Sequence, residues 1–506
     1  MRITTCETAA QVTDEHNAPP LQRRTPTLAV PRGLRQHPEE GSVAGASNEK
    51  FAQALAESGI SAMGLARRVR DLAKAHGGKT TATDHTAVAR WLAGQKPRPA
   101  TAKLVAEVLS RRLGRKVTEA DLGFTAPIRD PAAAMTYHHD AAATIEAATE
   151  LFRSDVHRRR EFLTETTLTA AAFAVPAVRY LTAPSRQPSA RLAGRQIGTE
   201  EVRAVRAVTA TFRTLDNQFG GGYGRSSITA YLNDQAAPML KQATYTAEIG
   251  SALHSAVAEL MLLAGWMAYD LEQHTTAAGY LIQALSLTEQ SGDNALGAEI
   301  LAGMSHQAAY LGQPEEAVDM ARAAGQCAKR AGQPVLTAEA LAAEAHGHAL
   351  AGNPRSAIAC LTTAEHALDS ADPANTPAYL AYFDAAYLAA KTAQTLRDAG
   401  DPTAAIEHAR RSLHMQAGYD RGRVFNLVLL ASAHTQAGQV DQAAATGSLA
   451  LAQANNLNST RTRHYLHDLA RRLERHHDVP EVAAFRGQAR ALLNSRPAAP
   501  ALPSVR

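Results

Sequence analysis

Residues 305–324 have the sequence SHQAAYLGQPEEAVDMARAA, and the spacing of their small residues indicates the fold. Ala317, Ala321 and Ala324 follow one another at i, i+4 and i+7, which places them on one face of a helix. Ser305 stands twelve residues before Ala317, and a Gly-Gln-Pro turn between them ends one helix and starts the next. The stretch therefore predicts two antiparallel helices that approach each other closely.

The same pattern recurs along the second half of the chain. Its small-residue triplets begin at Ala277, Ala317, Ala357, Ala405 and Ala443, and the matching small residues twelve positions earlier are Gly265, Ser305, Ala345, Ala393 and Ala431. A Gly turn lies between them in the last four units, whereas the first unit has Gln273-His274 there. One helix hairpin can bury its apolar face only against a neighbour, so the repetition predicts a stack of hairpins. Residues 202–219 and 482–493 are expected to be atypical end units.

These positions resemble the tetratricopeptide repeat, although the spacing here is longer than its usual period of about 34 residues. The resemblance implies an α-solenoid. Composition agrees with an all-α fold, because the hydrophobic content of 45% is largely Ala and Leu and only 5% of residues are aromatic.

Composition also indicates the cellular compartment in which we expect the protein. The three cysteines, Cys6, Cys327 and Cys360, lie far apart and predict neither a disulfide framework nor a zinc site. No stretch approaches the roughly 18–20 uninterrupted apolar residues that a membrane helix needs. Residues 1–30 lack the apolar core of a signal peptide. We therefore expect a cytoplasmic protein with no membrane partner.

Changes in composition predict five segments. They are a proline-rich disordered arm (1–46), a compact basic domain (47–124), a helical connector (125–195), the tetratricopeptide-like repeats (196–495) and a disordered tail (496–506). The formal net charge of the whole chain is only +4. Residues 61–116, however, hold 13 Lys and Arg against three acidic residues. That local excess favours a nucleic-acid partner, and a merely solvated basic face is the alternative.

The basic domain has a recognisable order of helix signals. Ser61 precedes one predicted helix, and Asp84 precedes a second helix that ends at Gly94. A third helix puts four apolar residues of 103–109 on one face. A Ser-x-x-x-Leu-Ala helix followed by Trp-x-x-Gly-x-x-Pro resembles the helix-turn-helix of lambda-repressor-like (XRE-type) regulators. The turn expected here, about residues 71–83, is longer than the tight turn of that motif.

The resemblance implies that the second helix enters the major groove of DNA. Val88 and Trp91 are then expected in the core. The residues expected at base edges are His85, Thr86, Ala89 and Arg90, and those expected at phosphates are Ser61, Arg67, Arg68, Lys96 and Arg98. A surface salt bridge is the alternative for Arg90.

Residues 48–493 together resemble actinobacterial, streptomycete-type regulators that join an XRE-type domain to tetratricopeptide-like repeats. The strings that carry this resemblance are VARWLAGQKP at 88–97, FGGG at 219–222 and AGWMAYD at 264–270. The resemblance implies a transcriptional regulator of development or secondary metabolism. It also implies a repeat domain that senses a peptide or protein, and a dimer geometry that such a ligand alters. A homodimer is therefore a possible assembly.

Stacked hairpins form a concave groove, which we expect among the first helices of the repeats. Candidate outward polar residues there are Gln307, His346 and Gln394. The alternative function is a protein–protein scaffold with a weak or vestigial DNA-binding domain.

Enzymatic activity is not expected, because no catalytic pairing of side chains can be assembled from the sequence. The chain is likewise expected to need no cofactor and no metal. The glycines of 220–224 lack the Gly-Lys-Ser/Thr ending of a phosphate loop and predict a flexible turn.

Overall fold

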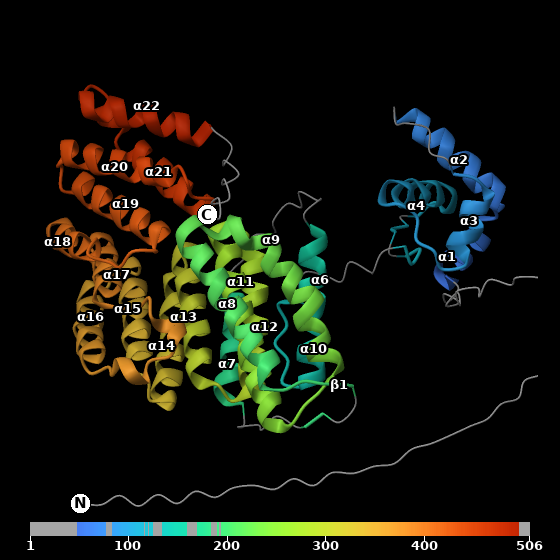
Figure 1. Ribbon diagram of the computed structural model, residues 1–506. Coiled ribbons are helices and arrows are strands. Elements are labelled where there is room, and N and C mark those ends of the chain that lie inside the picture. The colour runs from blue at the N-terminus through green and yellow to red at the C-terminus, as the bar shows by residue number, and fades with distance from the viewer. Residues whose placement is uncertain are drawn as a thin grey trace, which may run out of the picture. The chain divides into compact units, whose positions relative to one another are not determined.

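The computed structural model of the chain describes residues 48–76, 83–115, 117–119, 121–124, 134–158, 170–183, 190–191 and 194–494. The predicted arm and tail lie outside these residues. The chain divides into two units, residues 1–127 and 128–506, and each has its own hydrophobic core (Figure 1). The described residues are almost entirely helical, as the composition predicts.

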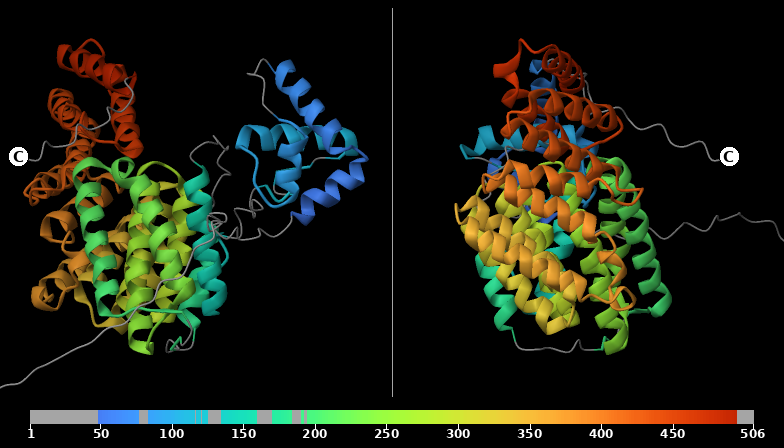
Figure 2. Two further views of the ribbon diagram at one scale, coloured as in Figure 1. Left: turned by 45° about the vertical axis from the view of Figure 1, so that its right-hand side comes forward. Right: turned by 90° about the vertical axis from the view of Figure 1, so that its left-hand side faces the viewer.

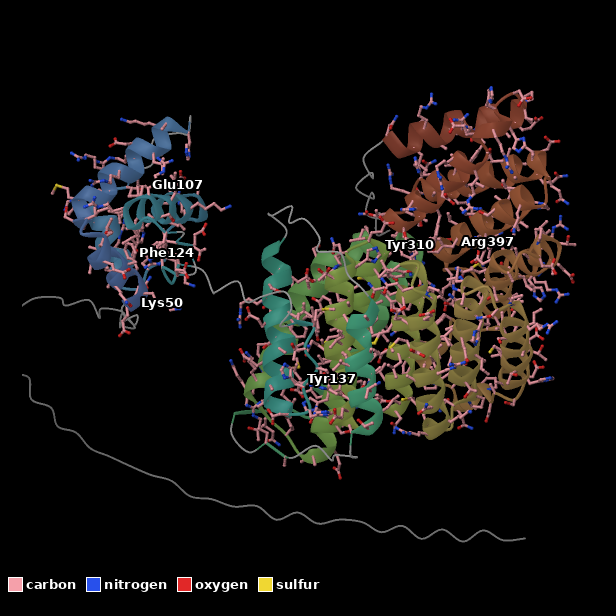
Figure 3. The ribbon with its side chains drawn as sticks, turned by 180° about the vertical axis from the view of Figure 1, so that it is seen from behind. Lys50, Glu107, Phe124, Tyr137, Tyr310 and Arg397 are labelled. Carbon is pink, nitrogen blue, oxygen red and sulfur yellow. The ribbon has the colours of Figure 1, made fainter. Side chains whose placement is uncertain are left out.

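The N-terminal unit contains helices α1 (Glu49–Ser58), α2 (Ala62–Ala75), α3 (His85–Leu92) and α4 (Pro99–Leu113). Asn48 caps α1 by accepting the Phe51 N–H, and its amide donates to the Leu122 carbonyl at 2.9 Å. The ring of Phe51 lies 4.7 Å from that of Phe124, which Figure 3 labels, and Trp91 packs edge-on against both. This aromatic cluster ties the two ends of the unit together.

Helix α2 is longer than the sequence analysis expected. The sequence predicts a turn at about residues 71–83, but the helix continues to Ala75, because Leu65, Val69 and Leu72 extend one buried face at helical spacing. The connection to α3 therefore covers residues 76–84. It is still longer than the tight turn of a typical helix-turn-helix.

The second unit is built from helix hairpins. Its helices are α6 (Ala141–Arg158), α7 (Ala174–Thr182), α8 (Thr199–Phe219), α9 (Gly221–Tyr231), α10 (Ala237–Gln242), α11 (Ala247–Asp270), α12 (His274–Ser291), α13 (Asn294–Tyr310), α14 (Pro314–Ala331), α15 (Pro334–Leu350), α16 (Pro354–Asp369), α17 (Ala385–Asp398), α18 (Pro402–Ser412), α19 (Asp420–Gln436), α20 (Val440–Ala454), α21 (Thr460–Arg472) and α22 (Pro480–Asn494). Two short parallel strands, β1 (Arg195–Gln196) and β2 (Ala243–Thr244), pair with each other. Short 3-10 turns and one π-helical turn, Leu232–Ala236, complete the unit.

Five hairpins, from α11/α12 to α19/α20, follow the predicted register. The first small residue of each triplet, Ala277, Ala317, Ala357, Ala405 and Ala443, is fully buried. Consecutive hairpins lie side by side, which gives the solenoid-like stack seen in Figures 1 and 2. The turn glycines have φ between 71° and 90°. Glu272 occupies this position in the first hairpin with φ 60°, a conformation that costs a residue with a Cβ about 1–2 kcal/mol.

The segment before the repeats packs into the same core. Helix α6 places Phe152 against Tyr280 of α12, and Asp155 of α6 pairs with Arg225 of α9 at 2.6 Å. Tyr137, labelled in Figure 3, donates to Glu289 at 2.6 Å. Described residues of the predicted connector from 134 onward are thus part of the second unit.

Helix α11 is the central helix of this unit. By length and composition it is apolar enough to cross a bilayer, but 78% of its most apolar window is buried among the other helices. Its surface is occupied by α8, α9, α12 and α21.

The glycines of 220–222 form a tightly packed helix junction. A Cβ on Gly221 would lie 2.6 Å from the Met267 carbonyl oxygen, and one on Gly222 would lie 2.4 Å from the Asn458 side chain. The Gly221 N–H donates to Asp270 at 3.0 Å, and the Gly222 N–H donates to the Asn458 carbonyl. The expected flexible turn is therefore wrong, because these glycines are needed for close approach of α9 to α11 and to the α20–α21 loop.

Replacing Gly221 by Ala is expected to lower the free energy of unfolding by about 1–3 kcal/mol, since the new methyl group meets backbone atoms that cannot move aside. Gly487→Ala is the matched control, because Gly487 lies within α22 with open space around its Cβ position. That change should instead stabilise by up to about 1 kcal/mol. Denaturant unfolding of the full chain measures both, and equal effects at the two positions would contradict the junction's role.

A buried ion network joins the ends of the solenoid to its first hairpin. Arg421 of α19 binds both carboxylate oxygens of Asp216 of α8, at 2.9 and 2.7 Å. Asp270 of α11, fully buried, lies 3.5 Å from Arg421 and 3.4 Å from Arg461 of α21. These contacts bring α8, α11, α19 and α21 around a common interior.

Candidate functional site

Helix α3 presents one buried and one exposed face. Val88 is fully buried and Trp91 is 6% exposed, as the sequence analysis predicted. The four residues expected at base edges, His85, Thr86, Ala89 and Arg90, are all exposed. The amphipathic spacing of this short helix therefore separates core residues from residues open to a partner.

The N-terminus of α3 is held by Asp84. The Asp84 carboxylate accepts the Ala87 N–H at 2.8 Å and the Thr86 hydroxyl at 2.6 Å. The hydrogen bond from Thr86, followed by that from Ala87, lowers the pKa of Asp84. Because the Thr86 hydroxyl donates its proton to Asp84, Thr86 can offer a partner only its oxygen lone pairs and its methyl group.

The cations around α3 differ in their partners. Among the described residues, the side chains of Arg67, Arg90, Lys96 and Arg98 make no ion pair. The surface salt bridge considered for Arg90 is therefore not seen. Arg68 donates to the Gly64 carbonyl at 3.3 Å, and Ser61 caps α2 by accepting the Gly64 N–H. All nine predicted DNA-contacting residues are exposed.

Two further arginines of the unit are paired with acidic residues. Arg111 pairs with Glu107, labelled on α4 in Figure 3, at 2.6 Å. Arg115 pairs with Glu57 at 2.7 Å. The predicted DNA contacts that make no ion pair among the described residues therefore lie on α2, on α3 and in the segment after α3.

The second unit encloses a cavity of about 370 Å³. The side chains that line it come from α8, α11, α13, α17, α19 and α21 and from residues 378–384 and 415–419. Four of these are first helices of hairpins, where the groove was expected. Seven aromatic side chains line it, although the chain is poor in aromatic residues: Trp266, Tyr379, Tyr382, Tyr387, Tyr419, Phe425 and Tyr465.

An acidic pair lies at one side of this cavity. The Tyr382 hydroxyl contacts Glu339 at 2.5 Å and Glu299 at 2.9 Å. Burial raises the pKa of both carboxyl groups, and the charge of Glu299 raises that of Glu339 further. Of the two carboxyl groups, Glu339 therefore has its pKa raised further above the ordinary value.

Two cations line the same cavity. The Arg461 guanidinium stacks between Tyr269 and Phe425, 4.4 and 4.5 Å from the ring centroids. Lys391 lies with its ammonium 5.6 Å from the Tyr387 ring, and burial lowers the pKa of Lys391 to about 7. Burial also lowers the pKa of His306, which lies in the same wall, so that its imidazole is neutral.

Of the predicted groove residues, only Gln394 lines the cavity. Gln307 is 1% exposed and donates to the His274 carbonyl, and His346 is buried against Asp398 at 3.0 Å. Their expected outward placement is wrong, because both helices turn these positions toward neighbouring helices.

Lys391 and Arg461 also line the cavity, but they are not among the residues predicted from the sequence. The sequence feature that could have pointed to this cavity is the high density of aromatic residues at 379–387.

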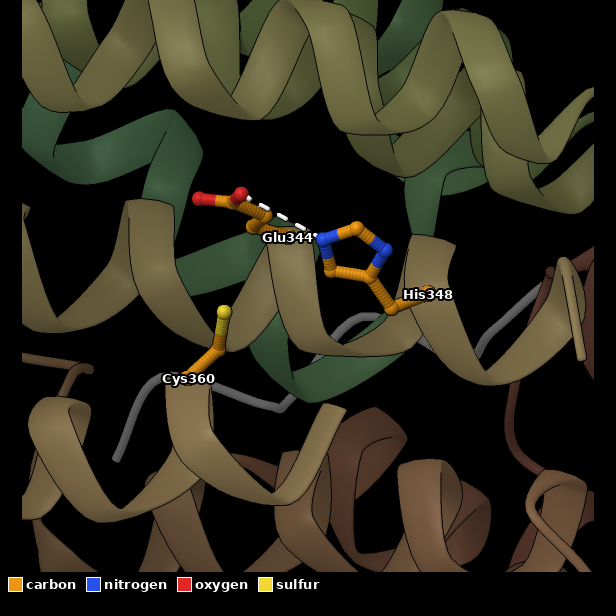
Figure 4. A group of neighbouring side chains, drawn as sticks. All are labelled: Glu344, His348 and Cys360. Atoms are coloured by element: carbon orange, nitrogen blue, oxygen red, sulfur yellow. Dashed lines mark ion pairs between the residues drawn. The ribbon is translucent and has the colours of Figure 1, made fainter. Parts of the chain in front are cut away.

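Glu344, His348 and Cys360 form a group whose ligand atoms lie within 4.8 Å of one another (Figure 4). His348 pairs with Glu344 at 3.4 Å, and Arg322 approaches the same carboxylate oxygen at 2.8 Å. Burial raises the pKa of the Cys360 thiol to about 11, which disfavours the thiolate that a metal requires. The Glu344 carboxylate is thus already engaged with Arg322 and His348.

A family model matches part of the N-terminal unit. Residues 51–125 match the family model described as the SP15 N-terminal domain. The match begins in α1 and includes α2, α3 and α4. No curated protein sequence matches the chain.

Proposed function

We propose that the chain is a cytosolic DNA-binding transcriptional regulator, in which α3 contacts DNA and the helical repeats sense a ligand or a protein. The observation that supports this most is the exposed face of α3. His85, Thr86, Ala89 and Arg90 lie open on a helix whose other face is fixed in the core. Rigid placement of this kind is what base recognition requires.

Each side chain of that face has a suitable base partner. Arg90 is long enough to bind the O6 and N7 atoms of guanine through two hydrogen bonds, and the methyl groups of Ala89 and Thr86 suit the thymine methyl. The unpaired Arg67, Lys96 and Arg98 suit phosphates, which set the register of the helix on DNA.

Selection of bound duplexes from a random DNA pool tests this proposal. The full chain at low salt is expected to enrich a short motif containing guanine, because Arg90 supplies the strongest base contact of the face. Arg115→Ala is the matched control and should enrich the same motif, since Arg115 is neutralised by Glu57. A pool that is unchanged after repeated rounds would overturn the proposal.

A scaffold is the second candidate. It is supported by the stack of hairpins, because stacked helix hairpins form extended surfaces that suit protein partners. A chain with Arg67, Arg90 and Lys96 all changed to Ala separates the two functions. If it fully restores a null strain, the scaffold is the correct function.

A further inference from the structure

The cations that line the cavity differ in whether a carboxylate pairs with them. Most of them are paired with a carboxylate of the described residues. These pairs are Arg213–Glu259, Arg397–Asp398, Arg421–Asp216, Arg461–Asp270 and Arg472–Asp468. Lys391 is the exception among the described residues, because no carboxylate lies within ion-pair distance of its ammonium group. The cavity therefore contains one cation whose charge is not matched at contact distance.

Among the described residues, the groups around Lys391 act on it without a direct ion pair. The titratable groups of the elements around it are Glu299 and His306 of α13, Glu339 and His346 of α15, Tyr387 of α17 and Arg461 of α21. Burial and the charge of Glu299 raise the pKa of Glu339, and the charge of Glu339 in turn raises the pKa of Lys391, which burial lowers more strongly. Glu299 accepts from Tyr382. Both histidines are neutral because burial lowers their pKa, and Arg461 adds positive charge.

A second unsatisfied donor lies in the same wall. Arg461 is 7% exposed, and its Nε atom has no hydrogen-bond partner among the described residues. Its position is fixed by Tyr269 and Phe425 on its two faces. A fixed donor left unpaired in a buried wall favours an acceptor group on whatever occupies the cavity.

We propose that this cavity binds a small organic anion, with a carboxylate or sulfonate group paired to Lys391 and an aromatic or other apolar body against Trp266, Tyr387 and Phe425. The volume of about 370 Å³ lies in the range of small-molecule sites. Aromatic walls with a few fixed polar groups are the usual composition of such sites. This site does not depend on DNA binding, and it assigns a ligand class to the repeats.

Anilinonaphthalene sulfonate, an aromatic anion that fluoresces in apolar sites, tests the proposal on the full chain. Its neutral relative phenylnaphthylamine has the same rings without the charge. Lys391→Met should weaken binding of the sulfonate by about tenfold or more and leave the neutral probe unchanged, since only the charged pair is lost. Lys329→Met, at an exposed lysine of α14, is the matched control and should change neither affinity.

The pH dependence provides a second measurement. The sulfonate binds the protonated amine, so its affinity should be complete below the Lys391 pKa of about 7 and fall as the pH rises above it. Lys391→Arg should retain binding and lose this pH dependence, because a guanidinium stays charged. The Lys391→Arg variant also tests the proposal if Lys391→Met does not fold.

Three results would overturn the proposal. The first is no saturable sulfonate binding by the wild-type chain. The second is equal weakening of both probes by Lys391→Met, and the third is unchanged sulfonate affinity in a folded Lys391→Met chain. None of them bears on DNA binding by the N-terminal unit.

Discussion

Replacement of Asp270 by Ala is expected to lower the free energy of unfolding of the full chain by about 3–5 kcal/mol, the cost of leaving buried charges without their partner. Asp270 is fully buried and lies near Arg421 and Arg461, and it also accepts the Gly221 N–H. Arg421 retains Asp216, but Arg461 loses its carboxylate. Denaturant unfolding followed by circular dichroism measures the change.

Asp319→Ala is the control for that experiment, because Asp319 is exposed on α14. Its effect should stay within about 0.5 kcal/mol. A loss below about 1 kcal/mol for Asp270→Ala would show that the buried network does not hold the two ends of the solenoid together.

Arg90→Ala should weaken binding to a selected DNA sequence by about 1–3 kcal/mol, because one bidentate base contact is lost. Binding to unrelated DNA should change little, so the preference for the selected sequence falls. Arg67→Ala should weaken binding to both DNAs alike, since a phosphate contact carries no sequence information. Titration of each variant against both duplexes measures the effect.

The two substitutions therefore serve as controls for each other. If Arg90→Ala and Arg67→Ala weaken both duplexes equally, Arg90 contacts phosphate and the assignment of α3 to the bases is wrong. If neither has an effect, α3 does not face DNA.

The hairpins could be predicted because their signal is local. Small residues at i, i+4 and i+7 must face a close neighbour wherever the hairpin lies, and Ala317 and Ala405 are fully buried accordingly. The exposed face of α3 is also local, since the capping residue Asp84 and the core residue Trp91 fix which side turns inward.

The cavity could not be predicted in the same way. It depends on how far the stack of hairpins curves, which brings Arg461 to Asp270 across 191 residues of sequence. No periodicity in the sequence predicts this contact between Arg461 and Asp270. Gln307 and His346 were misplaced for the same reason, because the sequence does not tell a groove-facing polar residue from one buried between helices.

The end of α2 illustrates a smaller error. Asp71 and the glycines that follow favour a break, but Leu72 and Ala73 continue the buried face and carry the helix to Ala75. Burial of two apolar side chains outweighs the local break signals.

Binding of duplex DNA by the full chain as a function of salt tests the central proposal most directly. With Arg67, Arg68, Lys96 and Arg98 on phosphates, the logarithm of the binding constant should fall with the logarithm of salt concentration at a slope of about −3 to −4. The affinity should therefore drop by about two orders of magnitude between about 50 mM and about 200 mM salt. No binding at about 50 mM salt, or an affinity independent of salt, would contradict the account.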